Sequence, residues 1–168
     1  LDWWVRWYEY GAEQDPLDHY EAFRELKKGK AGYEMETDTL AFVWWNSPGP
    51  PIAADRFATF AVSEVTLPPG RYRLEVTSDD GVRLYIDGER VVDHWDVHTP
   101  AVDERILRLG GSHRFEVEHF DAGGYTPPVA QGNFAFAKPQ PRPAAPARPS
   151  PPDKTAAAST ASATAATP

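Results

Sequence analysis

Two adjacent carboxylates, Asp79 and Asp80, precede Gly81 at the end of a predicted strand. Calcium takes several hard oxygen ligands in flexible geometry, so this pair could begin a calcium site. Two side chains are too few to complete one, and the other oxygens would have to come from elsewhere. A structural role is the alternative, in which Asp79 caps backbone amides of a turn and Gly81 adopts an unusual φ. Both interpretations remain open.

A second cluster, Asp-His-Trp-Asp-Val-His, occupies residues 93–98. His94 and His98 lie four residues apart, a spacing that would place them on one face of a helix. Because a strand or loop is expected in this region, the spacing does not predict a metal site. We expect Trp95 to fill the core of the domain instead.

Catalytic groups are not evident elsewhere. His113 and His119 lie on one face of a predicted strand, about 20 Å apart, which is too far for one shared ion, so we expect structural roles for both. The absence of cysteine excludes a thiol nucleophile and Cys-ligated zinc. No Ser-His-Asp order, phosphate-binding loop or distinctive pair of carboxylates appears. The sequence therefore predicts a protein that is not an enzyme.

The formal net charge of −8 is unevenly distributed. Residues 138–168 contain four basic residues and one acidic residue, so residues 1–137 carry −11. An acidic body argues against a nucleic-acid partner, since phosphate binding requires a basic face. No apolar run reaches about 18 residues, so no membrane span is predicted. The chain starts at Leu1, and a signal segment or membrane anchor before Leu1 remains an open alternative.

Composition divides the chain into two regions. Residues 1–137 contain every aromatic residue, whereas residues 138–168 are rich in Pro, Ala, Ser and Thr. The second region has too little apolar surface to offset the entropy lost on ordering. We therefore predict a domain at 1–137 and a disordered or extended tail at 138–168, which is either a linker or an arm along a partner.

The start of the chain is unusually aromatic. Trp3, Val5 and Trp7 alternate with other residues, which predicts a strand with one buried face. If Trp4 and Tyr8 are exposed together on the other face, they form a docking surface for a protein partner or for lipid headgroups.

One helix is predicted among many strands. Asp15 is a natural N-cap, Pro16 suits the first helical position and Gly29 ends the helix, which gives a helix over 16–28. Its apolar side carries four residues at every third position: Leu17, Tyr20, Phe23 and Leu26. Later strands are separated by turn residues: Pro68-Pro69-Gly70 predicts a type II turn with Gly70 at positive φ, Asp87-Gly88 a tight hairpin turn and Gly110-Gly111 a strand end. This pattern predicts an all-β sandwich or barrel.

The segment Tyr72–Trp95, YRLEVTSDDGVRLYIDGERVVDHW, resembles the signature of the protective-antigen-type (PA-fourteen) domain family. Its S-D-D-G and D-G elements carry most of the resemblance, which extends over about residues 3–137. The resemblance implies an antiparallel β-sandwich, in which the helix at 16–28 is an insertion. Many members of the family bind carbohydrate, and members occur in toxins, glycosidases and adhesins.

The resemblance also implies a binding site. In the fungal adhesin lectins of the family, adjacent aspartates bind a calcium ion that itself coordinates sugar hydroxyls; Asp79 and Asp80 match these aspartates. The lectins add an Asn from a later loop, where this chain has Asp121, and Asn133 is a more distant alternative. The expected ligand-binding residues are thus Asp79, Asp80, Asp121 and Tyr125, with calcium held by the three aspartates.

Two functional hypotheses follow. The first is a non-catalytic module of an exported protein, periplasmic, extracellular or on the cell surface, that binds a glycan or mediates adhesion with calcium as its cofactor. The second is a structural accessory subunit of an envelope or membrane-associated assembly. That subunit would dock to neighbouring proteins through the aromatic N-terminus, the helix at 16–28 and the tail. The family resemblance favours the first hypothesis.

Overall fold

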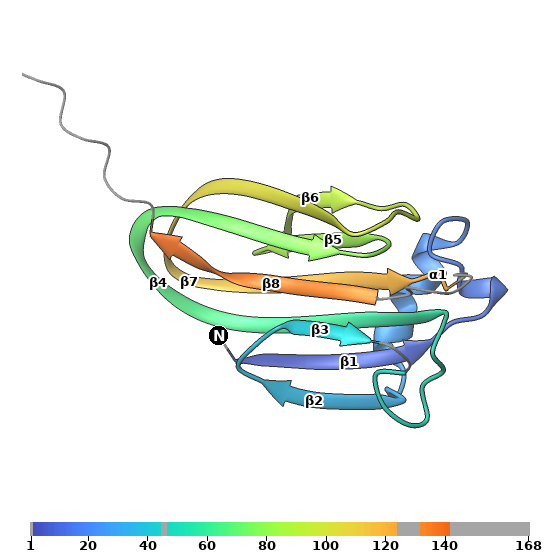
Figure 1. The fold of residues 1–168 in the computed structure, drawn as a ribbon. Coiled ribbons are helices and arrows are strands. Elements are labelled where there is room, and N and C mark those ends of the chain that lie inside the picture. Colours follow the sequence, from blue (N-terminus) through green and yellow to red (C-terminus); the bar gives the residue numbers. More distant parts are fainter. Residues whose placement is uncertain (1, 45–46, 124–131, 142–168) are drawn as a thin grey trace, which may run out of the picture.

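A computed structural model describes residues 2–44, 47–123 and 132–141, with backbone only for residues 43–44 and 132–141 (Figure 1). Every described strand pair is antiparallel. The elements in chain order are β1 (Trp3–Glu9), η1 (Ala12–Gln14), α1 (Tyr20–Glu25), η2 (Leu26–Lys28), β2 (Tyr33–Thr37), β3 (Ala41–Trp44), β4 (Phe57–Ser78), β5 (Val82–Ile86), β6 (Glu89–His94), β7 (Ala101–Asp121) and β8 (Gly132–Pro141). Residues 138–141, which we placed in the tail, thus belong to β8, and residues 142–168 lie outside the described part.

Two long strands, β4 and β7, pair along almost their whole length and arch together, so they contribute to both layers (Figure 1). In one layer, the first part of β4 and the last part of β7 lie within the order β2-β1-β4-β7-β5-β6. In the other layer, the last part of β4 pairs with β8, which pairs with β3. The predicted antiparallel β-sandwich with one short α-helix is confirmed.

The arch corrects two predictions. Pro68-Pro69-Gly70 is not a type II turn: β4 continues through it, with a register shift between Leu67 and Gly70, and Gly70 does not have a positive φ. Gly110-Gly111 likewise does not end a strand, because β7 continues and Gly111, opposite Leu67, adopts a φ of +95°. Local turn residues permit a sharp bend, and pairing with a second strand makes it a β-bulge instead of a chain reversal.

The main core lies between the two layers. Trp3, Val5 and Trp7 are at most 1% exposed, which confirms the predicted buried face of β1. They pack with apolar residues of β4, β5 and β7, including Leu74 and Phe115. The unpredicted strand β2 pairs with β1 and stacks Tyr33 on Trp7, with ring centroids 5.4 Å apart.

A second core covers the outer face of the sheet beside the helix. This outer cluster consists of Tyr8, Tyr10, Phe23, Ala58, Phe60 and Phe120, with Tyr20, Leu26 and Trp95 at its edge. Trp95 therefore packs at the edge of this outer cluster and does not fill the core between the sheets, contrary to our expectation. Tyr8 is only 5% exposed, so it does not form a docking surface with the exposed Trp4.

The helix is shorter than predicted. The Asp15 carboxylate accepts a hydrogen bond from the Leu17 amide, as an N-cap residue should. Residues 16–18 nevertheless form a turn, and α1 begins only at Tyr20. Leu17 is 49% exposed and so lies outside the predicted apolar side. Within the described residues, we find no helix with the length and apolar character needed to cross a membrane.

Candidate functional site

The candidate site lies where three chain segments meet, at the end of the sandwich beside α1 (Figure 1). These segments are the turn 79–81 after β4, the loop 95–100 after β6 and residues 121–123 at the end of β7. Four carboxylates gather there and interact electrostatically, and we call them the acidic end: Asp55, Asp79, Asp80 and Asp121.

Asp80 ties the three segments together. It is nearly buried; one of its carboxylate oxygens accepts the His98 amide at 3.3 Å and the other accepts the Ala122 amide at 2.8 Å. The amide-capping role predicted for Asp79 therefore belongs to Asp80, which also adopts the positive φ, 62°, predicted for Gly81. Gly81 is required for a close approach instead, because a Cβ there would lie 2.1 Å from the Phe120 ring.

The carboxyl groups at this end hold their protons unusually well. Burial, reinforced by Asp80, Asp55 and Asp79, raises the pKa of Asp121 to about 7. Burial and the neighbouring Asp80 raise the pKa of Asp79, and burial raises that of Asp80 despite its bonds to the Ala122 and His98 amides. In the described part of the chain, none of the ion pairs includes Asp79, Asp80 or Asp121. Salt bridges among the described residues thus do not neutralise these aspartates, and protonation relieves their mutual repulsion instead.

The predicted calcium ligands lie at one end of the domain but do not converge tightly. Among the described residues, Asp79, Asp80 and Asp121 do not form a group of donor atoms within 4.8 Å of one another. Tyr125 lies outside the described residues, so its predicted role in ligand binding stays a prediction, as does calcium itself.

The structure brings together a group that sequence analysis dismissed. His94, Asp96 and His98 place their donor atoms within 4.8 Å, and the two imidazole rings stack at 3.9 Å between centroids. A four-residue spacing indicates one face only on a helix, and a strand or loop is expected here; a fully extended chain would separate the two histidines by about 13 Å. The loop after β6 folds back, which no local sequence signal indicates.

His113 and His119 have structural partners, as expected. His119 is fully buried, with its ring nitrogens 3.3 Å from the Thr59 hydroxyl and 3.1 Å from the Asp79 carbonyl. Burial lowers the pKa of His119 to about 4, so the ring is neutral at pH 7. His113 bonds to Asp87 at 2.6 Å, next to the predicted hairpin turn, which is confirmed between β5 and β6.

The described structure contains open hollows, and two of them have known linings. One, of about 510 Å³, lies between α1 and residues 51–52, and the other, of about 340 Å³, lies beside Glu64 and His113. Neither is lined by the predicted site residues Asp79, Asp80 and Asp121.

The electrostatics predict a measurable pH dependence. Because the folded pKa of Asp121 is above that of the unfolded chain, its contribution to stability is complete below about pH 4 and is lost as pH rises through 7. His119 has the opposite effect, because its folded pKa is depressed: its contribution is complete above about pH 6.5 and is lost as pH falls towards 4. The two trends oppose each other in the native protein.

Asp121→Asn should therefore stabilise the domain at pH 8 in the presence of a chelator by roughly 2 kcal/mol. This is about half of the free energy that corresponds to the whole pKa shift of Asp121, because the side chain is partly solvated. The amide oxygen can still accept the Gly123 amide, which the native carboxylate accepts at 2.9 Å. Urea unfolding at pH 5 and pH 8 measures the effect, and the variant's stability should rise over the titration range of His119. A variant less stable than the native chain at pH 8 would contradict the assignment.

Comparison with known proteins agrees with this fold. The sequence model of the PA14 domain matches residues 5–141, and the chain therefore belongs to the PA14 domain family. No curated protein sequence matches the chain.

Among solved structures, the chain is similar to an anti-sigma factor domain-containing protein, with a TM-score of 0.61 and 16% identity over 83% of this chain. It spans only 45% of that protein. It is also similar to the PA14 domain of MpAFP antifreeze protein, with a TM-score of 0.59, 17% identity and coverage of 82% of this chain and 79% of that one. For the PA14 sugar-binding domain from an RTX adhesin, the TM-score is 0.59 and the identity 15%, over 80% of this chain and 86% of that one. These likenesses establish the fold.

Proposed function

We propose that this chain is a non-catalytic module of an exported protein that binds a glycan or mediates adhesion, and that its binding site is the acidic end. The observation that supports the proposal most directly is the raised pKa of Asp121 among three further carboxylates. A cation among these groups would remove their mutual repulsion. Carboxylate oxygens are the ligands that calcium prefers, so calcium is the cation we propose.

The hydrogen bonds of Asp80 are compatible with a calcium ligand. Each carboxylate oxygen has two lone pairs, so an oxygen that accepts a backbone amide can also bind an ion. Calcium–oxygen distances of about 2.3–2.6 Å require Asp79 and Asp121 to turn toward a common centre. Open coordination positions of the ion would then bind sugar hydroxyls, and Tyr125 would offer a ring for stacking. The likeness to an adhesin domain described as sugar-binding adds support for the class of ligand.

Calcium should stabilise the native chain against heat after chelator treatment. At about 100 times its Kd, it should add about 2.7 kcal/mol, which corresponds to several degrees in Tm. Asp79→Asn should weaken this effect strongly, because it removes a negative charge from the site without removing the amide bonds that Asp80 makes. The matched control is Asp38→Asn, an exposed aspartate in the segment between β2 and β3, which should keep the full response. A glycan array with calcium and with chelator then tests the ligand.

Each outcome bears on a separate part of the proposal. A native Tm that calcium does not change would refute the calcium site. Glycan binding that persists in chelator would support the binding function and refute calcium as its cofactor. An array without any calcium-dependent or calcium-independent signal would count against glycans as the ligand.

A further inference from the structure

We propose that His94, Asp96 and His98 form a binding site for a zinc-like divalent transition-metal ion, separate from the acidic end. The three residues follow one another on alternate positions, from the last residue of β6 into the loop that leads to β7. Each offers one donor atom, and these atoms lie within 4.8 Å of one another. The Nε2 atom of His94 is 3.4 Å from the Asp96 carboxylate.

Both imidazoles are oriented through the nitrogen that would not bind the ion. His94 Nδ1 lies 2.8 Å from a carboxylate oxygen of Asp103 on β7, and His98 Nδ1 lies 2.7 Å from the carbonyl oxygen of Thr99. A carbonyl only accepts hydrogen bonds, so Nδ1 of His98 carries the proton and Nε2 of the neutral ring keeps its lone pair. Metal-ligating histidines in proteins are typically held in this way, by a carboxylate or a backbone carbonyl on the second nitrogen.

The His98 Nε2 atom is the independent indication of a ligand. It is buried from solvent and has no hydrogen-bond partner among the described residues. Leaving a buried polar atom without a partner is unfavourable, so such atoms are rare in folded proteins. An ion bound at Nε2 would provide a partner.

The donor set selects the class of ion. Two imidazole nitrogens and one carboxylate suit zinc and its neighbours in the first transition series, whereas calcium prefers oxygen ligands alone. Zinc–nitrogen bonds of about 2.0–2.1 Å in tetrahedral geometry bring neighbouring donor atoms to about 3.3 Å, so the two rings must tilt out of their stack. Asp96 is 67% exposed and can move to follow them. Three protein ligands leave a fourth position for water.

The surroundings favour a cation and limit the movement of the loop. The His98 amide donates to Asp80, which places the site beside the negative charge of the acidic end. Trp95, between two of the ligands, packs on Phe23 and Phe120 and donates its indole N–H to the Pro16 carbonyl at 3.0 Å. The backbone that carries the ligands is thus anchored on both sides before any ion binds.

Titration calorimetry with Zn²⁺ alone, and the visible absorption of added Co²⁺, test the proposal on the chelator-treated chain of residues 1–168. We expect one zinc per chain, no competition from millimolar calcium and the intense visible bands of four- or five-coordinate Co²⁺. His98→Ala should weaken zinc binding at least a hundredfold, and Asp103→Asn, which removes only the orienting carboxylate of His94, by about tenfold to a hundredfold. His19→Ala, at an exposed histidine before α1, is the matched control and should change neither signal.

The outcomes that contradict the proposal are equally definite. Zinc binding that is unchanged in His98→Ala, or lost in His19→Ala, would show adventitious surface binding. Binding that is lost in Asp79→Asn would place the ion at the acidic end instead. Asp96→Asn keeps the test valid if His98→Ala fails to fold, because Asp96 is mostly exposed and its replacement should weaken zinc binding at least tenfold without unfolding the domain.

Discussion

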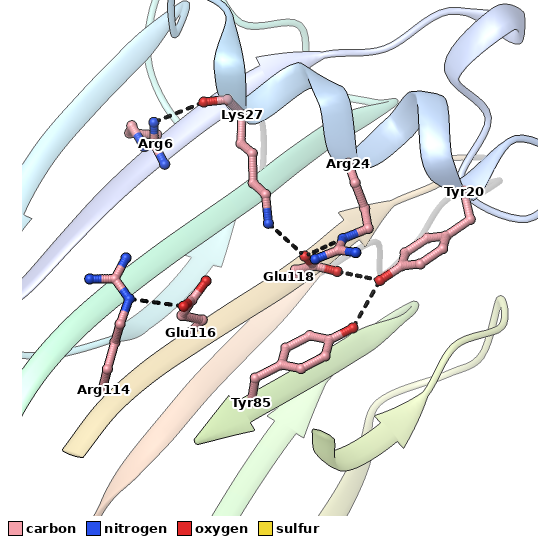
Figure 2. Close-up of polar contacts among 8 residues, drawn as sticks. All are labelled: Arg6, Tyr20, Arg24, Lys27, Tyr85, Arg114, Glu116 and Glu118. Atoms are coloured by element: carbon pink, nitrogen blue, oxygen red, sulfur yellow. Dashed lines mark hydrogen bonds and ion pairs between the residues drawn. The ribbon is translucent and has the colours of Figure 1, made fainter. Parts of the chain in front are cut away.

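Glu118→Ala should destabilise the domain by about 1.5–3 kcal/mol at pH 7, because it removes a buried carboxylate that accepts hydrogen bonds from charged side chains. Glu118 is 2% exposed, on the outer face of β7. One of its carboxylate oxygens binds the Arg24 Nε at 3.0 Å and the Lys27 Nζ at 3.1 Å, and the other accepts the Tyr20 hydroxyl at 2.6 Å (Figure 2). Without this carboxylate, two cations from one helical segment would face each other above the sheet.

Glu116→Ala is the matched control, two residues earlier on the same strand (Figure 2). Its ion pair with Arg114 has a similar length, 2.8 Å, but the side chains are 33% and 48% exposed. Exposed pairs of this kind contribute about 0–1 kcal/mol, because water screens them. Equilibrium urea unfolding of both variants gives the comparison. Equal losses of stability would show that burial does not distinguish the two pairs, and would contradict our account of how the helix is held.

The same contacts explain why the helix could be found in the sequence but not placed by it. Pro16 and Gly29 indicate a helix through local chemistry, and the spacing of Tyr20 and Phe23 indicates its apolar side. Nothing local indicates that Glu118, almost a hundred residues later, would receive Arg24. The helix also begins four residues later than predicted, because Asp15 caps a turn that does not continue into α1.

The candidate site shows a similar division. The S-D-D-G element marks the turn that holds Asp79 and Asp80, and the structure brings Asp121 into electrostatic contact with both. The sequence pattern does not show that Asp80 is the aspartate that connects the loops. The His98 and Ala122 amides, which donate hydrogen bonds to Asp80, come from distant segments of the chain. The bends at residues 68–70 and 110–111 were misinterpreted for the same reason: turn residues mark where a chain can bend, and the partner strand decides whether it reverses.

Phe23→Ala should be the second large effect, with a loss of about 3–5 kcal/mol. Phe23 is fully buried at the centre of the outer cluster. Its ring centroid lies within 6.4 Å of those of four other aromatic rings: Tyr10, Phe60, Trp95 and Phe120. Alanine would leave a cavity lined by large side chains that cannot easily collapse into it.

The control for this substitution is Leu17→Ala, six residues earlier but 49% exposed, which should change stability by no more than about 0.5 kcal/mol. Tryptophan fluorescence and urea unfolding report both variants, and a loss below about 1 kcal/mol for Phe23→Ala would mean that the helix is not part of the cooperative fold. The double variant of Phe23 and Glu118 gives a further test. Because both residues hold the same helical segment, the double variant should lose less stability than the sum of the two single losses.

Phe23→Ala should also affect the zinc site. Since Trp95 packs on Phe23, the substitution should loosen the loop that carries His94 and His98, and zinc binding should weaken.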